Sequence, residues 1–208
     1  MFLIYLPFVA FAQDSNAVNT KSDIELWESF SVDFKLANEF KVYIERQFRY
    51  YQELSRMKSH FTEIGARYRP IKWLGFRINY RFLSRMGEKR HRIDANVLQY
   101  FQLKSFQISN RSRLQKEFIE NKDSETVFRN RLRVKFNQNK KFIPFVGGEI
   151  FLGLADNNDQ NQFRLTVGAE WEMMKRFIIS PLYHYQKDLL KDKSELTHIF
   201  KIKFTFSF

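Results

Sequence analysis

Apolar side chains occupy alternate positions along the last strand-like segment of the chain. One face of this segment carries Leu196, His198, Phe200, Ile202, Phe204, Phe206 and Phe208, and the other carries mostly Thr197, Lys201, Lys203, Thr205 and Ser207. A period of two is typical of a β-strand whose two faces meet different environments. The segment is therefore predicted to be an amphipathic strand.

The same alternation recurs along most of the chain. It is clearest over residues 40–50, 74–82 and 163–171, and weaker over 24–36, 60–69, 91–103, 106–118, 126–136, 142–152 and 177–186. Each clear run has about the nine to eleven residues of a tilted membrane strand. With the final segment there are eleven runs. Because bacterial single-chain barrels have even strand numbers, we expect an all-β, antiparallel transmembrane β-barrel of 10–12 strands, with twelve favoured.

The connections between these runs also alternate in length. Brief turns at 37–39, 70–73, 104–105, 137–141 and 172–176 interleave with longer polar stretches at 51–59, 83–90, 119–125, 153–162 and 187–195. Short periplasmic turns and longer outer loops are typical of outer-membrane barrels. Trp73 and Trp171 fall beside short turns, where an interfacial aromatic girdle would place them.

The N-terminus predicts export. Residues 1–12 are almost entirely apolar and end in Ala10-Phe11-Ala12, an A-x-A cleavage pattern, although the usual Lys or Arg is missing ahead of the apolar stretch. We interpret residues 1–12 as a signal peptide, residues 13–23 as an N-terminal segment that is a candidate weak first strand, and residues 24–208 as the barrel. The predicted location is the outer membrane.

Composition changes this picture little. The chain is 44% hydrophobic, 28% charged and free of cysteine, and its mean hydropathy is −0.47. Such an average hides a barrel, because lipid-facing and lumen-facing residues alternate. The net charge of +12 would suit a nucleic-acid partner, but the basic residues recur at alternate strand positions rather than in one patch, so no nucleic-acid binding is expected.

The polar face of the runs is rich in ionisable residues, which belong in a polar lumen. As a structural network, guanidinium groups would cross-link the strands through carboxylates. As a functional feature, the excess of arginine would attract anions into a pore. The predicted lumen residues are Arg67, Arg69, Arg77, Arg81, Arg111, Arg113, Arg129, Arg131, Arg133, Lys135, Glu45, Glu63, Glu149 and Glu170.

A few polar residues fall on the apolar face. Glu28 and Arg46 come out opposite or diagonal across the turn near Asn38, and Asn110 and Asn130 come out opposite across the loop near residue 120. We interpret them as paired polar spots in the lipid-facing wall. The alternative is a local bulge that turns each residue inward.

Candidate chemistry is sparse. The chain has four histidines, His60, His91, His184 and His198, and only His198, with Ser194 and Glu195 nearby, offers a faint match to a barrel hydrolase. The oxygen-rich stretch 156–159 could ligate calcium, but solvated loop tips commonly look the same. We therefore predict no catalytic residue, no metal and no cofactor.

Several motifs carry a resemblance to known proteins. The final strand, with Phe204, Phe206 and the terminal Phe208, resembles the closing strand that barrel-assembly machinery reads. Ile24-Glu25-Leu26-Trp27, residues 44–49, and the arginine runs 110–114 and 129–133 resemble the family numbered 2490 among domains of unknown function. The resemblance implies an outer-membrane barrel without established activity, in which the arginine strands form a structural lumen network, and it transfers no catalytic residue.

Three functions remain open from the sequence. The first is an outer-membrane barrel with a structural or small-solute pore role. The alternatives are a barrel lipid hydrolase or deacylase, and a soluble periplasmic β-barrel that binds an apolar ligand. The expected partners are outer-membrane lipid, lipopolysaccharide and the barrel-assembly machinery, and the sequence does not indicate an oligomeric state.

Overall fold

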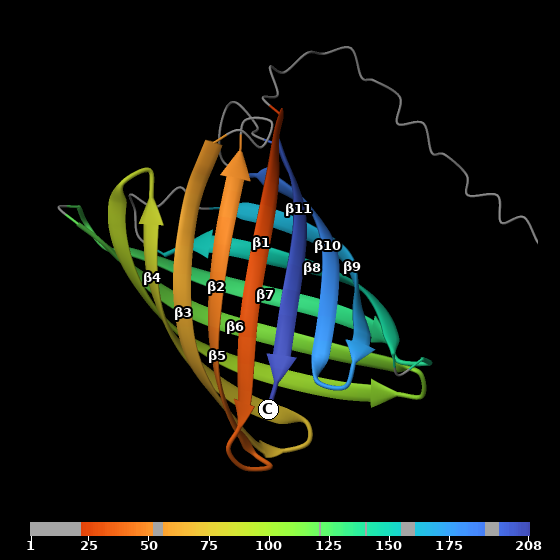
Figure 1. Cartoon of the computed structure of the whole chain (residues 1–208). Helices are drawn as coiled ribbons and strands as arrows, with labels where there is room; N and C mark the ends of the chain where they lie inside the picture. Colours follow the sequence, from red (N-terminus) through yellow and green to blue (C-terminus); the bar gives the residue numbers. More distant parts are fainter. Residues whose placement is uncertain (1–21, 52–55, 121, 140, 155–160, 190–195) are drawn as a thin grey trace, which may run out of the picture.

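Eleven strands form one closed sheet in the computed structural model, which describes residues 22–51, 56–120, 122–139, 141–154, 161–189 and 196–208 (Figure 1). No helix in these ranges is long and apolar enough to cross a membrane. The strands are β1 (Ser22–Lys35), β2 (Phe40–Tyr51), β3 (Arg56–Ile71), β4 (Leu74–Arg85), β5 (Glu88–Leu103), β6 (Phe106–Ile119), β7 (Glu125–Phe136), β8 (Phe142–Gly153), β9 (Gln162–Met174), β10 (Phe177–Asp188) and β11 (Leu196–Ser207).

The barrel closes between its first and last strands. Consecutive strands pair antiparallel, whereas β1 and β11 run parallel, with Ser22 opposite Leu196 and Asp33 opposite Ser207. In an up-and-down meander an odd number of strands makes the first and last point the same way, so parallel closure follows from eleven strands. The preference for twelve was therefore wrong, and the eleven amphipathic runs correspond to the eleven strands. Ser22 and Asp23 belong to β1, and residues 13–21 lie outside the described residues.

The connections divide the barrel into two ends. β1, β3, β5, β7 and β9 end at the short-turn end, together with the C-terminus, and β2, β4, β6, β8 and β10 end at the opposite, loop end. The longer loop expected at 83–90 is instead a two-residue turn, Met86-Gly87, in which both residues have positive φ (49° and 85°). Such turns match the twist of paired strands. The polar residues around this turn extend β4 and β5 rather than forming a loop.

Burial in this protein is inverted relative to a water-soluble domain. Among the described residues, nineteen polar or charged residues are buried but only eleven hydrophobic ones, while thirty-seven large hydrophobic residues are exposed. Inward positions such as Asn79 and Asp94 are 2% and 1% exposed, whereas outward Ile78 and Leu114 are 60% and 51% exposed. Soluble monomers rarely expose large continuous apolar surfaces. The wall is therefore built to face an apolar environment.

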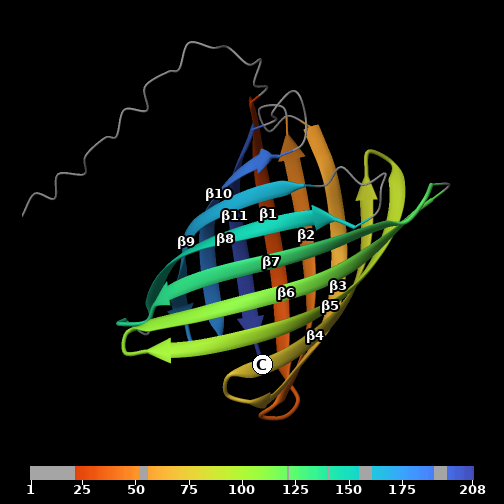
Figure 2. The same ribbon diagram turned by 180° about the vertical axis from the view of Figure 1, so that it is seen from behind.

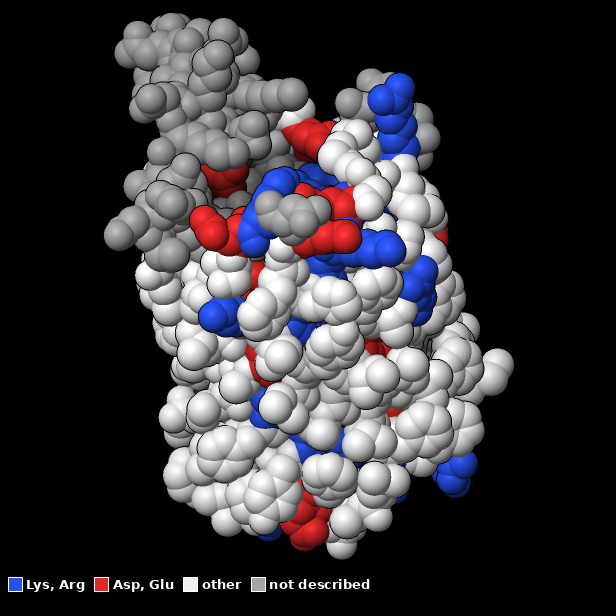
Figure 3. All heavy atoms as spheres, turned by 90° about the vertical axis from the view of Figure 1, so that its left-hand side faces the viewer, with Lys and Arg blue, Asp and Glu red and all other residues white. Residues whose placement is uncertain are grey.

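The density of charged groups on the outer surface changes along the barrel. Viewed from one side, charged atoms gather toward the loop end and mostly uncharged atoms cover the rest (Figure 3). Trp73 and Trp171 are about half exposed near the short-turn end, with Phe106 and Phe142 exposed at the same end. Aromatic residues favour a membrane interface because the ring is apolar and its edge tolerates water. This distribution is that of a barrel wall with an aromatic girdle.

Candidate functional site: the charged lumen

Inward-facing positions of all eleven strands enclose a cavity of about 1080 Å³. Its lining extends from Lys58 and Asp188 at the loop end to Lys41 and Ser207 at the short-turn end, so the cavity runs along the barrel. Figure 2 shows the back of the barrel, where β5 to β8 are strongly inclined relative to β1. The lining contains eighteen Lys or Arg residues and nine Asp or Glu residues. The lumen is therefore positively charged.

Glu149 on β8 joins three other strands. Its carboxylate lies 2.6 Å from the guanidinium of Arg111 on β6, 2.9 Å from that of Arg129 on β7 and 3.9 Å from that of Arg164 on β9. Glu149 itself is only 5% exposed. Charge-assisted hydrogen bonds of this kind are stronger than neutral ones, so Glu149 holds neighbouring strands of the wall together.

A second polar chain crosses β2 to β5. The Tyr43 hydroxyl lies 2.7 Å from Glu63 Oε1 and 2.6 Å from Asn79 Oδ1. Arg81 donates from Nε to Glu63 Oε2 at 2.8 Å and from a second nitrogen to the same oxygen. Asn79 in turn donates to Asp94 at 2.7 Å. The chain satisfies buried polar groups that water would otherwise have to reach.

Lumen side chains also cross the closing seam. Lys203 on β11 reaches over β1 to Glu45 on β2, with 2.5 Å between Nζ and Oε2. Lys201 donates to Gln47 at 2.8 Å, and the Ser29 hydroxyl donates toward Glu45 and Gln47. The parallel pair of β1 and β11 is therefore bridged from inside the barrel.

Several guanidinium groups rest on aromatic rings. Arg49 lies 4.1 Å from the ring centre of Trp27, and Arg133 lies 4.3 Å from that of Phe145. Arg81 and Arg129 stack in the same way on Phe61 (3.7 Å) and Phe151 (4.1 Å). A cation over a ring face is stabilised without a carboxylate. Such stacking holds the guanidinium groups in place. Arg81, Arg129 and Arg133 also pair with carboxylates, whereas Arg49 does not in the described residues.

The predicted lumen residues divide into three groups. Arg81, Arg111, Arg113, Arg129, Arg133, Lys135, Glu45, Glu63, Glu149 and Glu170 form ion pairs inside the barrel. Arg67, Arg77 and Arg131 line the cavity, but their guanidinium groups make no hydrogen bond or ion pair with the described part of the chain. Arg69 lies at the short-turn end, where it donates to the Lys72 carbonyl and stacks 4.4 Å from the Tyr100 ring.

The sequence interpretation missed several lumen residues. Glu117 pairs with Arg90 and Arg92, and Glu25 pairs with Lys58 at 2.5 Å. The same interpretation also omitted Arg49, Asp94 and Arg164, and it placed Lys201 and Lys203 on the polar face of the last strand without counting them as lumen charges. Each of them except Lys58 has the inward parity of its strand, so consistent use of the alternation would have found them.

The wall residues face outward, as their parity predicts. Glu28 and Arg46 occupy diagonal positions of the β1–β2 ladder, but Arg46 donates to Thr62 on β3 at 2.7 Å. Asn130 lies opposite Ser112 and donates to its hydroxyl at 3.0 Å, because the hairpin register is centred at residue 121 rather than 120.

Asn110 therefore does not face Asn130, and the predicted direct pairing of these two residues was wrong. Asn110 instead donates to Gln99 on β5 at 3.2 Å.

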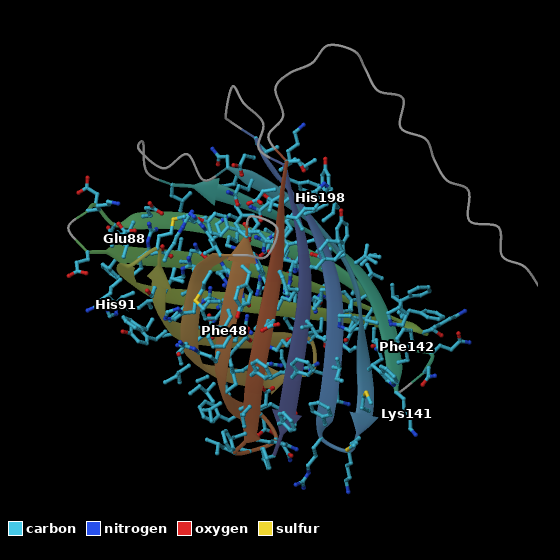
Figure 4. The ribbon with its side chains drawn as sticks, turned by 45° about the horizontal axis from the view of Figure 1, so that its top comes forward. Phe48, Glu88, His91, Lys141, Phe142 and His198 are labelled. Atoms are coloured by element: carbon cyan, nitrogen blue, oxygen red, sulfur yellow. The ribbon has the colours of Figure 1, made fainter. Side chains whose placement is uncertain are left out.

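The histidines do not assemble a hydrolase site in the described ranges. His198 Nδ1 lies 2.7 Å from the Tyr183 hydroxyl, and His91 Nδ1 lies 2.6 Å from that of Tyr80, both on the outer face. His184 faces the lumen and contacts Thr166 at 2.8 Å. In Figure 4, Glu88 and His91 lie at the opposite end of the barrel from Lys141 and Phe142.

Two candidate features extend beyond the residues that the structure describes. One is the pair Ser194 and Glu195, which the sequence sets near His198, and the other is the candidate calcium stretch 156–159. Residues 194, 195 and 156–159 lie outside the described residues. Within the described residues, no group of three or more His, Cys, Asp and Glu side chains could hold a metal ion.

The terminal aromatic residues are anchored on the outside of the seam. The rings of Phe204 and Phe30 stack with centres 5.2 Å apart, and those of Phe208 and Phe34 lie 5.8 Å apart. The main chain of Phe208 donates to the Asp33 carbonyl at 2.8 Å. Phe206 stacks on Phe177 at 4.5 Å, so the last strand is fixed on both sides.

Comparison with solved structures identifies barrels that are similar to this one. Among solved structures, the chain is similar to the KdgM porin in complex with disordered oligogalacturonate, at 11% identity and a TM-score of 0.50, covering 79% of this chain and 90% of KdgM. It also matches the outer-membrane expressed OmpT of Vibrio cholerae, at 11% identity and a TM-score of 0.40, covering 71% of this chain and 53% of OmpT. The KdgM likeness shows a shared fold.

The family of the chain is shown by sequence. No curated protein matches it. A family model described as a protein of unknown function, DUF2490, matches residues 24–196, which include β2 to β10, all but two residues of β1 and the first residue of β11. The chain therefore belongs to the DUF2490 family.

Proposed function

We propose that this protein is an outer-membrane pore that passes small anionic solutes. One observation carries the proposal, namely the twofold excess of cationic over anionic side chains along a cavity that reaches both ends of the barrel. A channel lined by one sign of charge concentrates ions of the opposite sign. Anion-selective pores are usually lined by arginine and lysine side chains arranged in a ring around the channel.

The size of the cavity supports a small solute. A volume of about 1080 Å³ spread along the barrel leaves room for small solutes. The KdgM porin, which shares the fold, was captured with an oligogalacturonate, a chain of carboxylate sugars. That ligand has the charge that the present lumen would attract.

The wall supports the membrane location. Exposed apolar residues surround the barrel, and the aromatic girdle lies at the short-turn end, which we place in the periplasm. The outward surface would then contact outer-membrane lipid and lipopolysaccharide, and the strand ending at Phe208 would be read by the barrel-assembly machinery. Heat-modifiable gel mobility of the protein in an outer-membrane fraction tests this location, and a soluble, unshifted protein would contradict it.

Conductance tests the pore. The protein is refolded into planar bilayers, and the reversal potential is measured across a potassium chloride gradient. We expect a reversal potential of the sign that shows preference for chloride. A folded protein that conducts no ions, or that prefers potassium, would overturn the proposal.

Two matched variants separate lumen charge from total charge. Arg133→Gln removes a cation that lines the cavity, and Lys116→Gln removes one on the outer face of the adjacent strand β6. We expect Arg133→Gln to weaken chloride preference and Lys116→Gln to leave it unchanged. Equal effects would mean that selectivity does not arise in the lumen.

A further inference from the structure

Among the described residues, four cavity-lining arginines with a shielded Nε, namely Arg49, Arg67, Arg77 and Arg131, form no ion pair with a carboxylate. Arg49 lies near the loop end, 4.1 Å from the Trp27 ring centre. Arg67 on β3 lies directly opposite Arg77 on β4, and Arg131 on β7 lies directly opposite Arg111 on β6. The Nε atoms of Arg67, Arg77 and Arg131 are shielded from solvent and have no hydrogen-bond partner. Like charges directly opposite each other on a sheet are destabilising. The fold nevertheless keeps this arrangement.

Nearby carboxylates are already engaged by other cations. Glu149 is the residue opposite Arg131, but its Oε1 receives Arg111 at 2.6 Å and Arg129 at 2.9 Å. Glu63 on β3 already forms an ion pair with Arg81. A buried charge without a partner is costly. A solute that brings negative charge would therefore stabilise this group of cations.

Arg77 is central among these cations. Electrostatic interactions link it to Arg111 and Arg113 on β6 and to Arg131 and Arg133 on β7. They also link it to Glu63, which Arg81 already holds. Arg77 also lies 5.8 Å from the Tyr43 ring centre, which keeps the guanidinium inside the barrel. An anion beside Arg77 would lower the mutual repulsion of the whole group.

We propose that Arg67, Arg77 and Arg131 form a binding site for a doubly charged oxyanion of the phosphate or phosphate-monoester class, in the half of the lumen nearer the short-turn end. The inference rests on the proposed function, because the ligand must enter the lumen. Guanidinium offers a planar fork of N–H donors that matches phosphate oxygens, whereas chloride accepts no such paired bonds. Three unneutralised cations favour a dianion over a monoanion.

Calorimetric titration of the folded protein in zwitterionic detergent with sodium phosphate tests the site. We expect one saturable site whose Kd rises at least tenfold in Arg77→Gln and in Arg67→Gln. The matched control is Arg85→Gln, because Arg85 lines the cavity on the same strand as Arg77 but at the loop end, and its Kd should be unchanged. Arg77→Lys keeps the charge but not the fork, and should also weaken binding.

Stability provides a second readout that does not depend on heat of binding. A ligand that binds only the folded state raises the unfolding midpoint, so phosphate should raise the urea midpoint of the wild type and not that of Arg77→Gln. Removing one of two facing cations relieves repulsion, so both glutamine variants should fold and show heat-modifiable mobility.

The outcomes separate the two proposals. No saturable phosphate binding by the wild type, or equal weakening by Arg85→Gln, would overturn the site even if the pore proves anion-selective. Binding that is lost in Arg77→Gln, in a protein that conducts no ions, would support the site and overturn the pore.

Discussion

The aromatic ring of Tyr43 lies across Gly65. The two residues are directly opposite on β2 and β3, and Gly65 is in turn opposite Asn79 on β4. A Cβ atom on Gly65 would stand 2.4 Å from the Tyr43 ring and 2.3 Å from Asn79 Oδ1. The missing side chain lets Tyr43 cross a whole strand to reach its hydrogen-bond partners on β3 and β4.

Gly65→Ala is therefore expected to destabilise the barrel. The methyl group would displace Tyr43 from Glu63 and Asn79, and overpacking of this kind costs about 1–3 kcal/mol. Urea unfolding in detergent micelles measures the loss. Gly148→Ala is the control, because a Cβ there would meet nothing closer than 3.8 Å. Equal stability of the two variants would show that the position of Tyr43 does not depend on the missing side chain at Gly65.

Neutralising Glu149 should loosen the wall. Glu149→Gln removes the charge shared by Arg111, Arg129 and Arg164. Leaving buried cations without their partner costs about 3 kcal/mol, measured as a lower free energy of unfolding. The same variant should increase chloride preference, because the lumen becomes more positive. Both changes are expected together, and a stable variant with increased selectivity would mean that lumen water replaces the carboxylate.

Glu88→Gln is the control for this experiment. Glu88 pairs at the loop end with Arg90 and with Lys122, whose side chain is 62% exposed. Solvent screens such pairs, so the variant should unfold with nearly wild-type stability. A loss as large as that of Glu149→Gln would point to a general effect of removing acidic residues.

The sequence predicted which face each residue occupies more reliably than which residues meet. Alternation assigns Arg111 and Glu149 to the lumen correctly, but their contact crosses β7. Contacts over an intervening strand depend on the curvature and stagger of the closed barrel, which a linear pattern does not contain. The three cations that meet Glu149 could not be selected from the many inward arginines by spacing alone.

The two errors of topology have separate causes. The sequence shows eleven amphipathic runs, but twelve strands were favoured because bacterial barrels usually have even strand numbers. At residues 83–90 the alternation continues through Arg85 and Lys89 beyond the apolar band, and polar composition was interpreted as a loop. Gly87 after Met86 was the turn signal in this stretch, because glycine accepts positive φ without strain.

The hydrogen bond between Asn130 and Ser112 should contribute measurably to the wall. A double-mutant cycle of Asn130→Leu and Ser112→Ala is expected to give a coupling energy of about 0.6 kcal/mol, the average for such bonds in a membrane. Ser84→Ala on β4 replaces Ser112→Ala in the control cycle, where the effects should add because the residues do not touch. Additivity in the first cycle would mean that the bond adds nothing.

The depth dependence of a charged substitution tests the membrane wall most directly. Leu114 lies within β6 and is 51% exposed, and Leu103 ends β5 at the short-turn end and is 58% exposed. Arginine facing lipid costs about 2–4 kcal/mol at the bilayer midplane and about 0–1 kcal/mol near the interface. Leu114→Arg should therefore reduce the free energy of folding into lipid vesicles far more than Leu103→Arg.

The comparison separates lipid from water as the surroundings of the wall. The two leucines are almost equally exposed, so a barrel surrounded by water would tolerate both arginines equally well, since exposed substitutions on a soluble protein have small effects. Folding is measured in vesicles by urea titration, with heat-modifiable mobility as the sign of the closed barrel. A large cost confined to Leu114→Arg requires an apolar medium at that height, whereas small and equal costs would remove the basis for placing the barrel in a bilayer.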